Sequence, residues 1–595
     1  MTSRLIVLAL ATLTACSNDL ALGDSDASSS GPSTDMSAGQ TSATPTTGAP
    51  DSSSTGEPTS STSTGGPDTS TSSDTSDTST TTGDASSTTG GGDTSTGDEP
   101  GTSTTTGGMG EVPEGCEVVP IVDDVLLLQL QSKLNLPKQQ PISGASALTV
   151  EALHLDPPKG LTSLAGMQCF INLKSLIMHG GGVSDLGPLS TLPALELLEI
   201  ESNTISDLGP LVGAPALRKL YVSGNQIVDL APVVAMPELE ELEIPHNPIT
   251  SFAALAGHPS LRRLDGSYTK TTNLDGLGAL PKLDTLVLSH AGVTDIALLA
   301  SVTGLVSLDL SQNAIADISA LAGMSGLTTL KINNNKVVDI AALAGKPALV
   351  DLDLSINQIG DIAALAGDTA LVDVNLGGNA VTDLSVLASM PALAIVRVAG
   401  NMVTDLSPLA GHAALYELSA QHNQIADVTG LVDLPVLQRL FLSGNQISDP
   451  APLGGLSSLT YLYLDENPLA AGIAGLAPLS KLESLEVSST GITELIAISP
   501  ATLLALFAAD NTIVDLSPLA GHSELGYLGL KNNQITTISP IAMAPYWDGT
   551  CATLEITGNP LDVQTTSVFL PSLCDLQNSV FWDGGGCGGC EPAPP

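Results

Sequence analysis

The chain has 595 residues and a formal net charge of −44 at pH 7, from 62 Asp and Glu against 18 Lys and Arg. Such an acidic surface repels nucleic-acid phosphates and anionic lipid headgroups, and this excludes nucleic acid as a partner. Hydrophobic residues make up 42% of the sequence but aromatic residues only 3%, so the core must be aliphatic.

The amino-terminal segment begins with a short positive stretch that ends at Arg4, followed by an apolar run from Leu5 to Leu13. This run is too short to span a bilayer. The next residues, Thr14-Ala15-Cys16, complete a sequence that resembles the lipobox of bacterial lipoproteins. The resemblance implies that residues 1–15 are a signal peptide and that Cys16 carries a lipid, which anchors the protein to a bacterial membrane facing the periplasm or the cell surface. The alternative is an ordinary signal peptide with a chance cysteine.

Residues 16–115 consist mostly of Ser, Thr, Gly, Asp and Pro, and contain neither Lys nor Arg. Such a segment has too little apolar surface to offset the entropy lost on folding. We expect a disordered tether that lifts the folded part away from the membrane. The alternative is a segment without a function of its own, which would be equally disordered.

A repeat of 22 residues dominates the rest of the sequence. Each unit opens with a leucine, and the opening leucines at steps of 22 are Leu173, Leu195, Leu217, Leu239, Leu261, Leu283, Leu305, Leu327, Leu349, Leu371, Leu393, Leu415, Leu437 and Leu459. The spacing then becomes irregular through Leu482, Leu503 and Leu525. In the unit of Leu305, the alternation of Leu308 and Leu310 is typical of a short strand with one buried face. An asparagine follows the strand in most units, and we expect a stacked column of amides to satisfy the turn backbone. The column comprises Asn203, Asn225, Asn247, Asn313, Asn335, Asn357, Asn379, Asn401, Asn423, Asn445, Asn467, Asn511 and Asn533.

This L-x-x-L-x-L-x-x-N frame, with its following Ile-x-Asp-Leu segment, resembles the leucine-rich repeats of the 22-residue, internalin-like class. The resemblance implies an α/β repeat solenoid, a horseshoe with a concave parallel sheet and convex 3₁₀ turns, which is capped at both ends. We place the array at 150–560, a helical amino-terminal cap at 116–149 and a carboxy-terminal cap with a Cys/Gly/Pro tail at 561–595.

The six cysteines other than Cys16 lie at or beyond the ends of the array, so we expect disulfides that close these ends. The apolar stripe within residues 122–136 resembles the helical cap of internalin-like proteins, and Cys116 and Cys169 would staple it. At the other end, the preferred bridge joins Cys551 to Cys574. For Cys587 and Cys590 we expect a local disulfide rather than a redox or metal pair.

Three polar patterns admit a metal, and each has a simpler structural explanation. An aspartate recurs after the strands and could line a cation column, but we expect each to cap its own turn. Asp351 to Asn357 alternates oxygen ligands as a calcium loop does, but it coincides with the repeat frame and has Ile356 where such a loop needs glycine. His258, His412 and His522 share one repeat position, where we expect surface loops. No zinc-ligand spacing is present, and we predict no metal and no cofactor.

Every well-patterned segment is explained by the repeat, and the sequence contains no G-x-S-x-G, Walker or H-E-x-x-H motif, so we predict no enzyme. Residues two, four and six places after each opening leucine should face away from the core. In most units these residues are small or polar, but in the late units several are aromatic or Arg. Exposed aromatic and Arg residues are typical of protein interfaces. The partner-binding candidates are Arg439, Phe441, Tyr461, Tyr463, Asp465, Glu486, Phe507, Tyr527 and Lys531. Lateral ring packing within the sheet is the alternative, and Tyr221 is a weaker candidate.

The predicted function is therefore a surface-anchored scaffold that binds another protein or a surface glycan on its concave face. A structural or adhesive surface protein without one specific ligand is the second hypothesis. An enzyme, or a regulator of one, is the remote third.

Overall fold

The computed structural model describes residues 111–155, 160–495, 502–547 and 551–588. The predicted signal peptide, the lipidation of Cys16, the tether up to residue 110 and the pairing of Cys590 lie outside the described residues. Within the described part, no helix is both long enough and apolar enough to cross a membrane.

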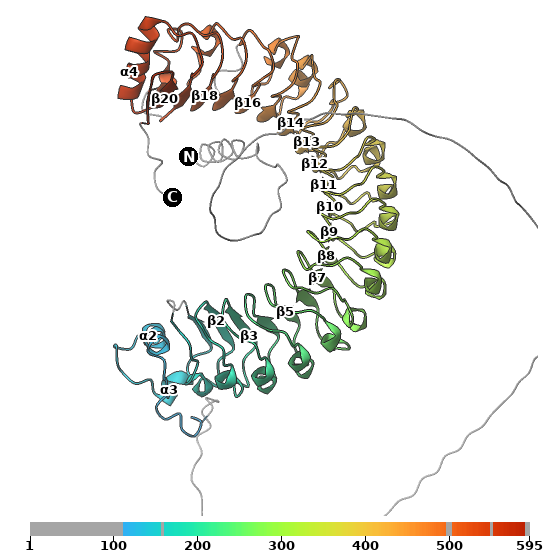
Figure 1. Cartoon of the computed structure of the whole chain (residues 1–595), viewed down its shortest axis with the longest axis vertical. Helices are drawn as coiled ribbons and strands as arrows, with labels where there is room; N and C mark the ends of the chain where they lie inside the picture. Colours follow the sequence, from blue (N-terminus) through green and yellow to red (C-terminus); the bar gives the residue numbers. More distant parts are fainter. Residues whose placement is uncertain (1–110, 156–159, 496–501, 548–550, 589–595) are drawn as a thin grey trace, which may run out of the picture. The chain divides into compact units, whose positions relative to one another are not determined.

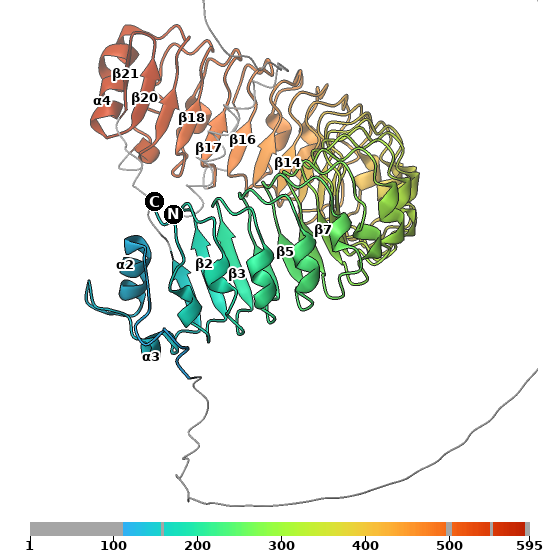
Figure 2. The same ribbon diagram turned by 60° about the horizontal axis from the view of Figure 1, so that its bottom comes forward.

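The repeat strands form one sheet in chain order. Each strand from β1 to β20 is parallel to the next, and β21 closes the sheet antiparallel to β20. The strands line the inner side of the curved array (Figure 1), and a turned view shows them side by side (Figure 2). Their bounds are β1 Ala152–Leu155, β2 Ser175–His179, β3 Leu197–Glu201, β4 Lys219–Tyr221, β5 Glu241–Glu243, β6 Arg263–Asp265, β7 Thr285–Val287, β8 Ser307–Asp309, β9 Thr329–Lys331, β10 Asp351–Asp353, β11 Asp373–Asn375, β12 Ile395–Arg397, β13 Glu417–Ser419, β14 Arg439–Phe441, β15 Tyr461–Tyr463, β16 Ser484–Glu486, β17 Ala505–Phe507, β18 Tyr527–Gly529, β19 Thr553–Glu555, β20 Ser579–Trp582 and β21 Gly585–Cys587.

Short 3₁₀ helices form the outer side of the array (Figure 1). They are η1 Met167–Cys169, η2 Gly187–Leu189, η3 Gly209–Gly213, η4 Ala231–Ala235, η5 Ala253–Leu255, η6 Leu277–Ala279, η7 Ala297–Ser301, η8 Ser319–Gly323, η9 Ala341–Leu343, η10 Ala363–Leu365, η11 Ser385–Ser389, η12 Ser407–Leu409, η13 Ala451–Gly455, η14 Ala474–Leu476, η15 Ser517–Leu519 and η16 Pro545–Trp547. The predicted horseshoe class, with a concave parallel sheet and convex 3₁₀ turns, is therefore confirmed.

The core is a continuous aliphatic stack between the two layers. In β8 the middle residue Leu308 is fully buried, as are Leu305 before the strand and Leu310 after it. Fully burying one such side chain contributes about 1.5–3 kcal/mol, and neighbouring repeats stack their leucines at the same position. The array is thus stabilised repeat by repeat rather than by one central core.

The predicted asparagine column is confirmed, and Asn335 shows how it works. Its Oδ1 accepts a 3.0 Å hydrogen bond from the N–H of Ile315 in the preceding repeat. Its Nδ2 donates to the carbonyl oxygens of Leu310 at 3.0 Å and Ile332 at 3.0 Å. Each amide therefore satisfies backbone groups of two repeats at once, which fixes their spacing.

The two ends are closed by helical segments. At the amino end, α2 (Asp124–Lys133) begins at Asp123, whose side chain accepts from the N–H groups of Val125 and Leu126. The same carboxylate accepts a 2.9 Å bond from the N–H of Thr162 in the array. A short helix, α3 (Gly144–Ala147), follows. At the other end, a π-helical turn, η17 (Thr565–Phe569), leads into α4 (Leu570–Asp575).

The disulfides confirm one predicted pairing and correct two. Cys116 is bonded to Cys169, with a Cα–Cα distance of 5.6 Å. Cys574 is bonded to Cys587, so the expected Cys551–Cys574 and Cys587–Cys590 bridges are wrong. The reason is the hairpin of β20 and β21, which pairs Val580 with Cys587 and returns the chain beside α4. Cys551 is also disulfide-bonded.

The three repeat-position histidines are buried, which corrects the expectation of surface loops. His258, His412 and His522 each turn into the core. Other repeats place Met236 and Met324 at this position, and both are buried. The preceding Leu-Ala-Gly therefore ends the outer 3₁₀ turn and directs the next side chain inward, rather than leaving it in solvent.

Candidate binding site on the concave face

The residues singled out in the late repeats lie together on the concave face, over β14 to β18. We call Arg439, Phe441, Tyr461, Tyr463, Asp465, Glu486, Phe507, Tyr527 and Lys531 the aromatic patch. The middle residue of each three-residue strand is buried in the core, so the flanking residues project from the sheet. The strand register places Arg439 beside Tyr461, and it places Phe441, Tyr463, Glu486 and Phe507 in one row.

The rings of the patch pack on their lateral neighbours. Phe441 and Tyr463 meet edge to face with 5.1 Å between ring centroids, and Phe507 and Tyr527 lie 4.6 Å apart in a tilted arrangement. Tyr463 is only 9% exposed, whereas the other rings are half-buried. Lateral packing, the alternative raised from the sequence, therefore does occur. It also fixes the rings rigidly, so that a ligand would meet them at little cost in side-chain entropy.

Arg439 is held between two tyrosines, one of which the sequence pattern missed. Its guanidinium carbon lies 5.8 Å from the ring centroid of Tyr416 and 5.4 Å from that of Tyr461. Its Nη1 is 3.5 Å from a carboxylate oxygen of Glu417. Tyr416 directly follows an opening leucine, outside the places two, four and six along, so the position rule could not select it. Glu417 does lie at the second place, and the rule could have found it.

Two carboxylates inside the patch, Asp465 and Glu486, are not paired with a Lys or Arg of the described chain. Among the described residues, no Lys or Arg forms an ion pair with Asp465 or Glu486. Burial raises the pKa of Glu486 to about 7, and the negative charge of Asp465 adds to the effect, while hydrogen bonds from Ser488 oppose it. Burial likewise raises the pKa of Asp465, against a hydrogen bond from the Ser443 hydroxyl. The patch therefore carries an acidic centre in which Glu486 titrates near neutral pH and the pKa of Asp465 is raised.

Lys531, the last residue of the patch, is exposed and follows β18. Lys531 is two residues after the end of β18, as Asp465 is two residues after the end of β15. It therefore lies at the edge of the patch, and the rings and carboxylates lie at its centre.

The earlier repeats carry a ladder of charges that are paired with one another. Tyr221 donates a 2.6 Å hydrogen bond to Glu241, which also pairs with Lys219 at 2.8 Å. Arg263 pairs with Glu243 at 2.8 Å. Each of these pairs contributes little to stability, because it is partly exposed to solvent. The hydroxyl of Tyr221 is already hydrogen-bonded within the sheet, so Tyr221 remains a weaker candidate for partner binding.

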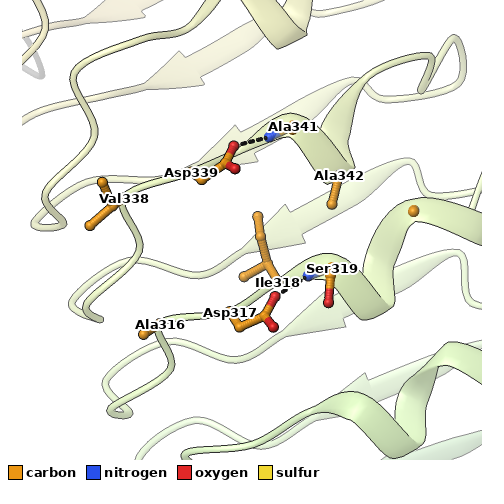
Figure 3. Close-up of a pocket in the computed structure, with 9 residues that line it drawn as sticks. Ala316, Asp317, Ile318, Ser319, Val338, Asp339, Ala341 and Ala342 are labelled. Atoms are coloured by element: carbon orange, nitrogen blue, oxygen red, sulfur yellow. Dashed lines mark hydrogen bonds between the residues drawn. The ribbon is translucent and has the colours of Figure 1, made fainter. Parts of the chain in front are cut away.

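The recurring aspartates cap the convex 3₁₀ turns, as predicted. In each case a carboxylate oxygen accepts a hydrogen bond from the N–H two residues later, as between Asp317 and Ser319 and between Asp339 and Ala341, both at 2.8 Å. Figure 3 shows these two caps beside an open hollow of about 510 Å³ between successive turns. The hollow follows from the spacing of the repeats, and its lining consists of small and aliphatic residues with the two capping aspartates and Ser319. The remaining caps are Asp185, Asp207, Asp229, Asp295, Asp361, Asp383, Asp405, Asp427, Asp449 and Asp515.

The segment that alternates oxygen ligands like a calcium loop is part of the repeat frame. Leu352 and Leu354 are fully buried, and Asn357 takes its place in the amide column. Asp353 accepts from the N–H and the hydroxyl of Ser355, at 2.9 and 2.6 Å. The simpler structural explanation is confirmed.

Comparisons with known proteins agree with this architecture. The family model described as Leucine Rich repeats (2 copies) matches residues 303–345, and no curated protein matches the chain. An internalin (InlF) from Listeria monocytogenes is 24% identical with a TM-score of 0.47, over 62% of this chain and 95% of that one. A TDR receptor is 19% identical with a TM-score of 0.52, over 69% of this chain and 76% of that one. The PEPR1-AtPEP1 structure is 19% identical with a TM-score of 0.51, over 69% and 66%. At these identities the likeness to the two latter structures concerns the fold.

Proposed function

We propose that this chain, a leucine-rich repeat protein, is a binding scaffold that holds a protein ligand on its concave face, with the aromatic patch as the contact surface. The observation that carries the proposal is the concentration of rings there. The patch holds three of the seven tyrosines and two of the six phenylalanines of a chain that is only 3% aromatic. Aromatic and Arg side chains in fixed, half-buried positions are the residues that dominate binding energy at protein interfaces.

The charges of the patch indicate the chemistry of the ligand. Among the described residues Asp465 and Glu486 pair with no Lys or Arg, so a ligand that brings one would complete the pair, while the rings around them would contact its apolar side chains. A polypeptide carries both kinds of group. A glycan, the other candidate partner, would stack on the rings but would bring no base.

We also propose that the protein is attached to a bacterial membrane through a lipid on Cys16, with the Ser/Thr-rich segment as a spacer. The support is the resemblance of Leu13-Thr14-Ala15-Cys16 to a lipobox. Expression in a bacterium with and without globomycin, followed by mass spectrometry of the mature amino terminus, tests this part. We expect globomycin-sensitive processing and a lipid-modified Cys16. A mature chain that begins at another residue would show that the anchor is wrong.

The test of the binding proposal is capture of a partner by the wild-type array and by a patch variant. The variant carries Phe441→Ser, Tyr461→Ser and Phe507→Ser. Serine suits the first two positions, since the array itself places Ser419 beside Phe441 and Ser484 beside Tyr461. We expect the wild type to retain a protein from a matched surface extract and the variant to lose it.

A matched control removes aromatic rings elsewhere on the array. His246, Tyr268 and His290 stack on one another, with centroid distances of 4.3 and 4.8 Å, in the turns after β5 to β7. Replacing all three with Ser should leave capture unchanged. If the patch variant captures the partner as well as the wild type does, the patch is not the site. If the wild type retains no protein, the structural or adhesive hypothesis replaces this one.

A further inference from the structure

A second polar cluster lies on the concave face at the opposite end of the array from the aromatic patch. His179 ends β2, and Glu199 and Glu201 lie on β3, with His179 in register with Glu201. The Nε2 atom of His179 is 3.2 Å from Oε1 of Glu199, and its Nδ1 atom is 3.5 Å from Oε2 of Glu201. One donor atom from each of the three residues can be chosen so that all three atoms lie within 4.8 Å of one another.

A second imidazole lies beside this cluster. His154 is on β1, the neighbour of β2, and its ring centroid is 6.0 Å from that of His179. Three adjacent strands thus bring two imidazoles and two carboxylates to one point of the sheet. Nitrogen and carboxylate donors in this ratio suit a divalent transition metal, whereas Ca²⁺ and Mg²⁺ prefer oxygen donors alone.

The carboxylates of the cluster have no Lys or Arg partner in the described part of the chain. Among the described residues, the ion-pair partner of Glu199 and Glu201 is His179 in both cases. The nearest lysine on the next strand, Lys219, is paired with Glu241. Together the two carboxylates carry two negative charges, which a divalent ion would balance.

We propose that His179, Glu199 and Glu201 bind a divalent transition-metal ion, with His154 as a further ligand, and that this site is independent of the aromatic patch. In a tetrahedral site with bonds of about 2.0–2.2 Å, ligand atoms are about 3.3 Å apart. The His179–Glu199 separation of 3.2 Å already fits such an edge. Glu201 contacts the other ring nitrogen of His179, Nδ1, so its side chain must rotate to reach an ion bound at Nε2. His179 and Glu201 have room to rotate, because they are 42% and 34% exposed.

The local sequence could not reveal this site. Its ligands come from different strands, and the spacing of His179 to Glu199 is set by the repeat length rather than by a compact motif. The signal was nevertheless present, because His179 lies six places after Leu173, and Glu199 and Glu201 lie four and six places after Leu195. All three occupy outward-facing positions of the frame.

Isothermal titration of Zn²⁺ into the untagged, metal-free full chain tests the proposal, with Co²⁺ absorption as a second readout of the ligand geometry. We expect one equivalent of Zn²⁺ to bind, and tetrahedral Co²⁺ bands to appear. His179→Ala and the near-isosteric pair Glu199→Gln with Glu201→Gln should each weaken binding at least tenfold. His154→Ala should weaken it less, since three ligands remain.

The matched control is Glu241→Gln with Glu243→Gln, which removes two carboxylates from the same face of the sheet and should leave Zn²⁺ affinity unchanged. Thermal unfolding of each variant without metal shows that the fold is retained. The proposal is overturned if the wild type binds no Zn²⁺, or if His179→Ala binds it as tightly. Displacement of Zn²⁺ by an equal concentration of Ca²⁺ would also overturn it, because the site would then be a general acidic surface.

Discussion

The backbone N–H of Lys346 donates a 2.8 Å hydrogen bond to Oδ1 of Asp368, one repeat further along the core. Both residues are almost fully buried, in the column that holds Met324 and Met390 in neighbouring repeats. The other carboxylate oxygen of Asp368 is buried and has no hydrogen-bond partner in the described part of the chain. Burial raises the pKa of Asp368 and lowers that of Lys346.

This arrangement predicts a pH-dependent effect of Asp368→Asn. An acid whose pKa is raised in the folded state contributes stability below its unfolded pKa, near 4, and loses that contribution as pH rises through its folded pKa. The stability of the wild type relative to the variant should therefore fall as pH rises from 4 towards 7. Urea unfolding of both proteins across that range measures the difference. A constant difference would show that Asp368 does not titrate as the structure requires.

Ile356 predicts a stabilising substitution. It occupies the left-handed turn position before Asn357, with φ 53°, where the next repeat has Gly378 with φ 66°. A β-branched residue is strained there, and it is 58% exposed, so it contributes little packing. We expect Ile356→Gly to raise stability by about 0.5–1 kcal/mol, after the flexibility of glycine in the unfolded chain is discounted.

The control for this change is Val338→Gly. Val338 is 57% exposed but is not among the residues with positive φ, so glycine relieves no strain there. It should lower stability by up to about 1 kcal/mol. Thermal unfolding of the two variants should thus shift the midpoint in opposite directions, and a shared direction would contradict the assignment of strain to Ile356.

The amide column predicts a large cost for Asn401→Ala. This side chain accepts from the N–H of Val381 at 2.9 Å and donates to the carbonyls of Leu376 at 2.9 Å and Val398 at 3.0 Å. Removing it leaves several buried backbone groups unsatisfied, so we expect a loss of about 3 kcal/mol. Asp405→Ala removes two exposed hydrogen bonds, those from the N–H and the hydroxyl of Ser407, and should cost about 1 kcal/mol. Equal losses in denaturant unfolding would contradict the role given to the column.

The carboxy-terminal disulfide predicts which thiol a single substitution releases. In Cys574→Ser, the freed thiol should be that of Cys587, because these two residues are bonded with a Cα–Cα distance of 5.9 Å. Alkylation of the unreduced variant, followed by peptide mass spectrometry, identifies it. Modification of Cys551 instead would contradict the Cys574–Cys587 bond and support the Cys551–Cys574 bond predicted from the sequence.

The sequence predicts the periodic features well because each is repeated many times. The buried leucines, the amide column and the aspartate caps are all local to one repeat and its neighbour. Features that occur once were harder to predict. The hairpin of β20 and β21 extends the sheet beyond residue 560 and brings Cys587 to Cys574. It occurs once and lies outside the 22-residue repeat, so the repeat pattern does not predict it. The buried position of His258 was missed because a polar residue occupies a core column that aliphatic residues usually fill.

The binding face illustrates the same distinction. The rule for outward-facing positions placed the aromatic patch on one surface, as the strand register shows. The rule carried no information on ring-to-ring contacts, so it could not predict that Tyr463 would be nearly buried against its neighbours. It also could not anticipate the pKa of Glu486, about 7, which depends on burial between strands.

Site-specific photo-crosslinking tests the central claim most directly. A benzoylphenylalanine at Tyr461, in the patch, is compared with one at Tyr268, in the control stack of His246, Tyr268 and His290, after each protein is mixed with a matched surface extract. We predict a defined crosslinked protein from position 461, competed by soluble wild-type array, and none of that mass from position 268. Crosslinking of the same partner from Tyr268 but not from Tyr461 would contradict the assignment of the ligand to the aromatic patch.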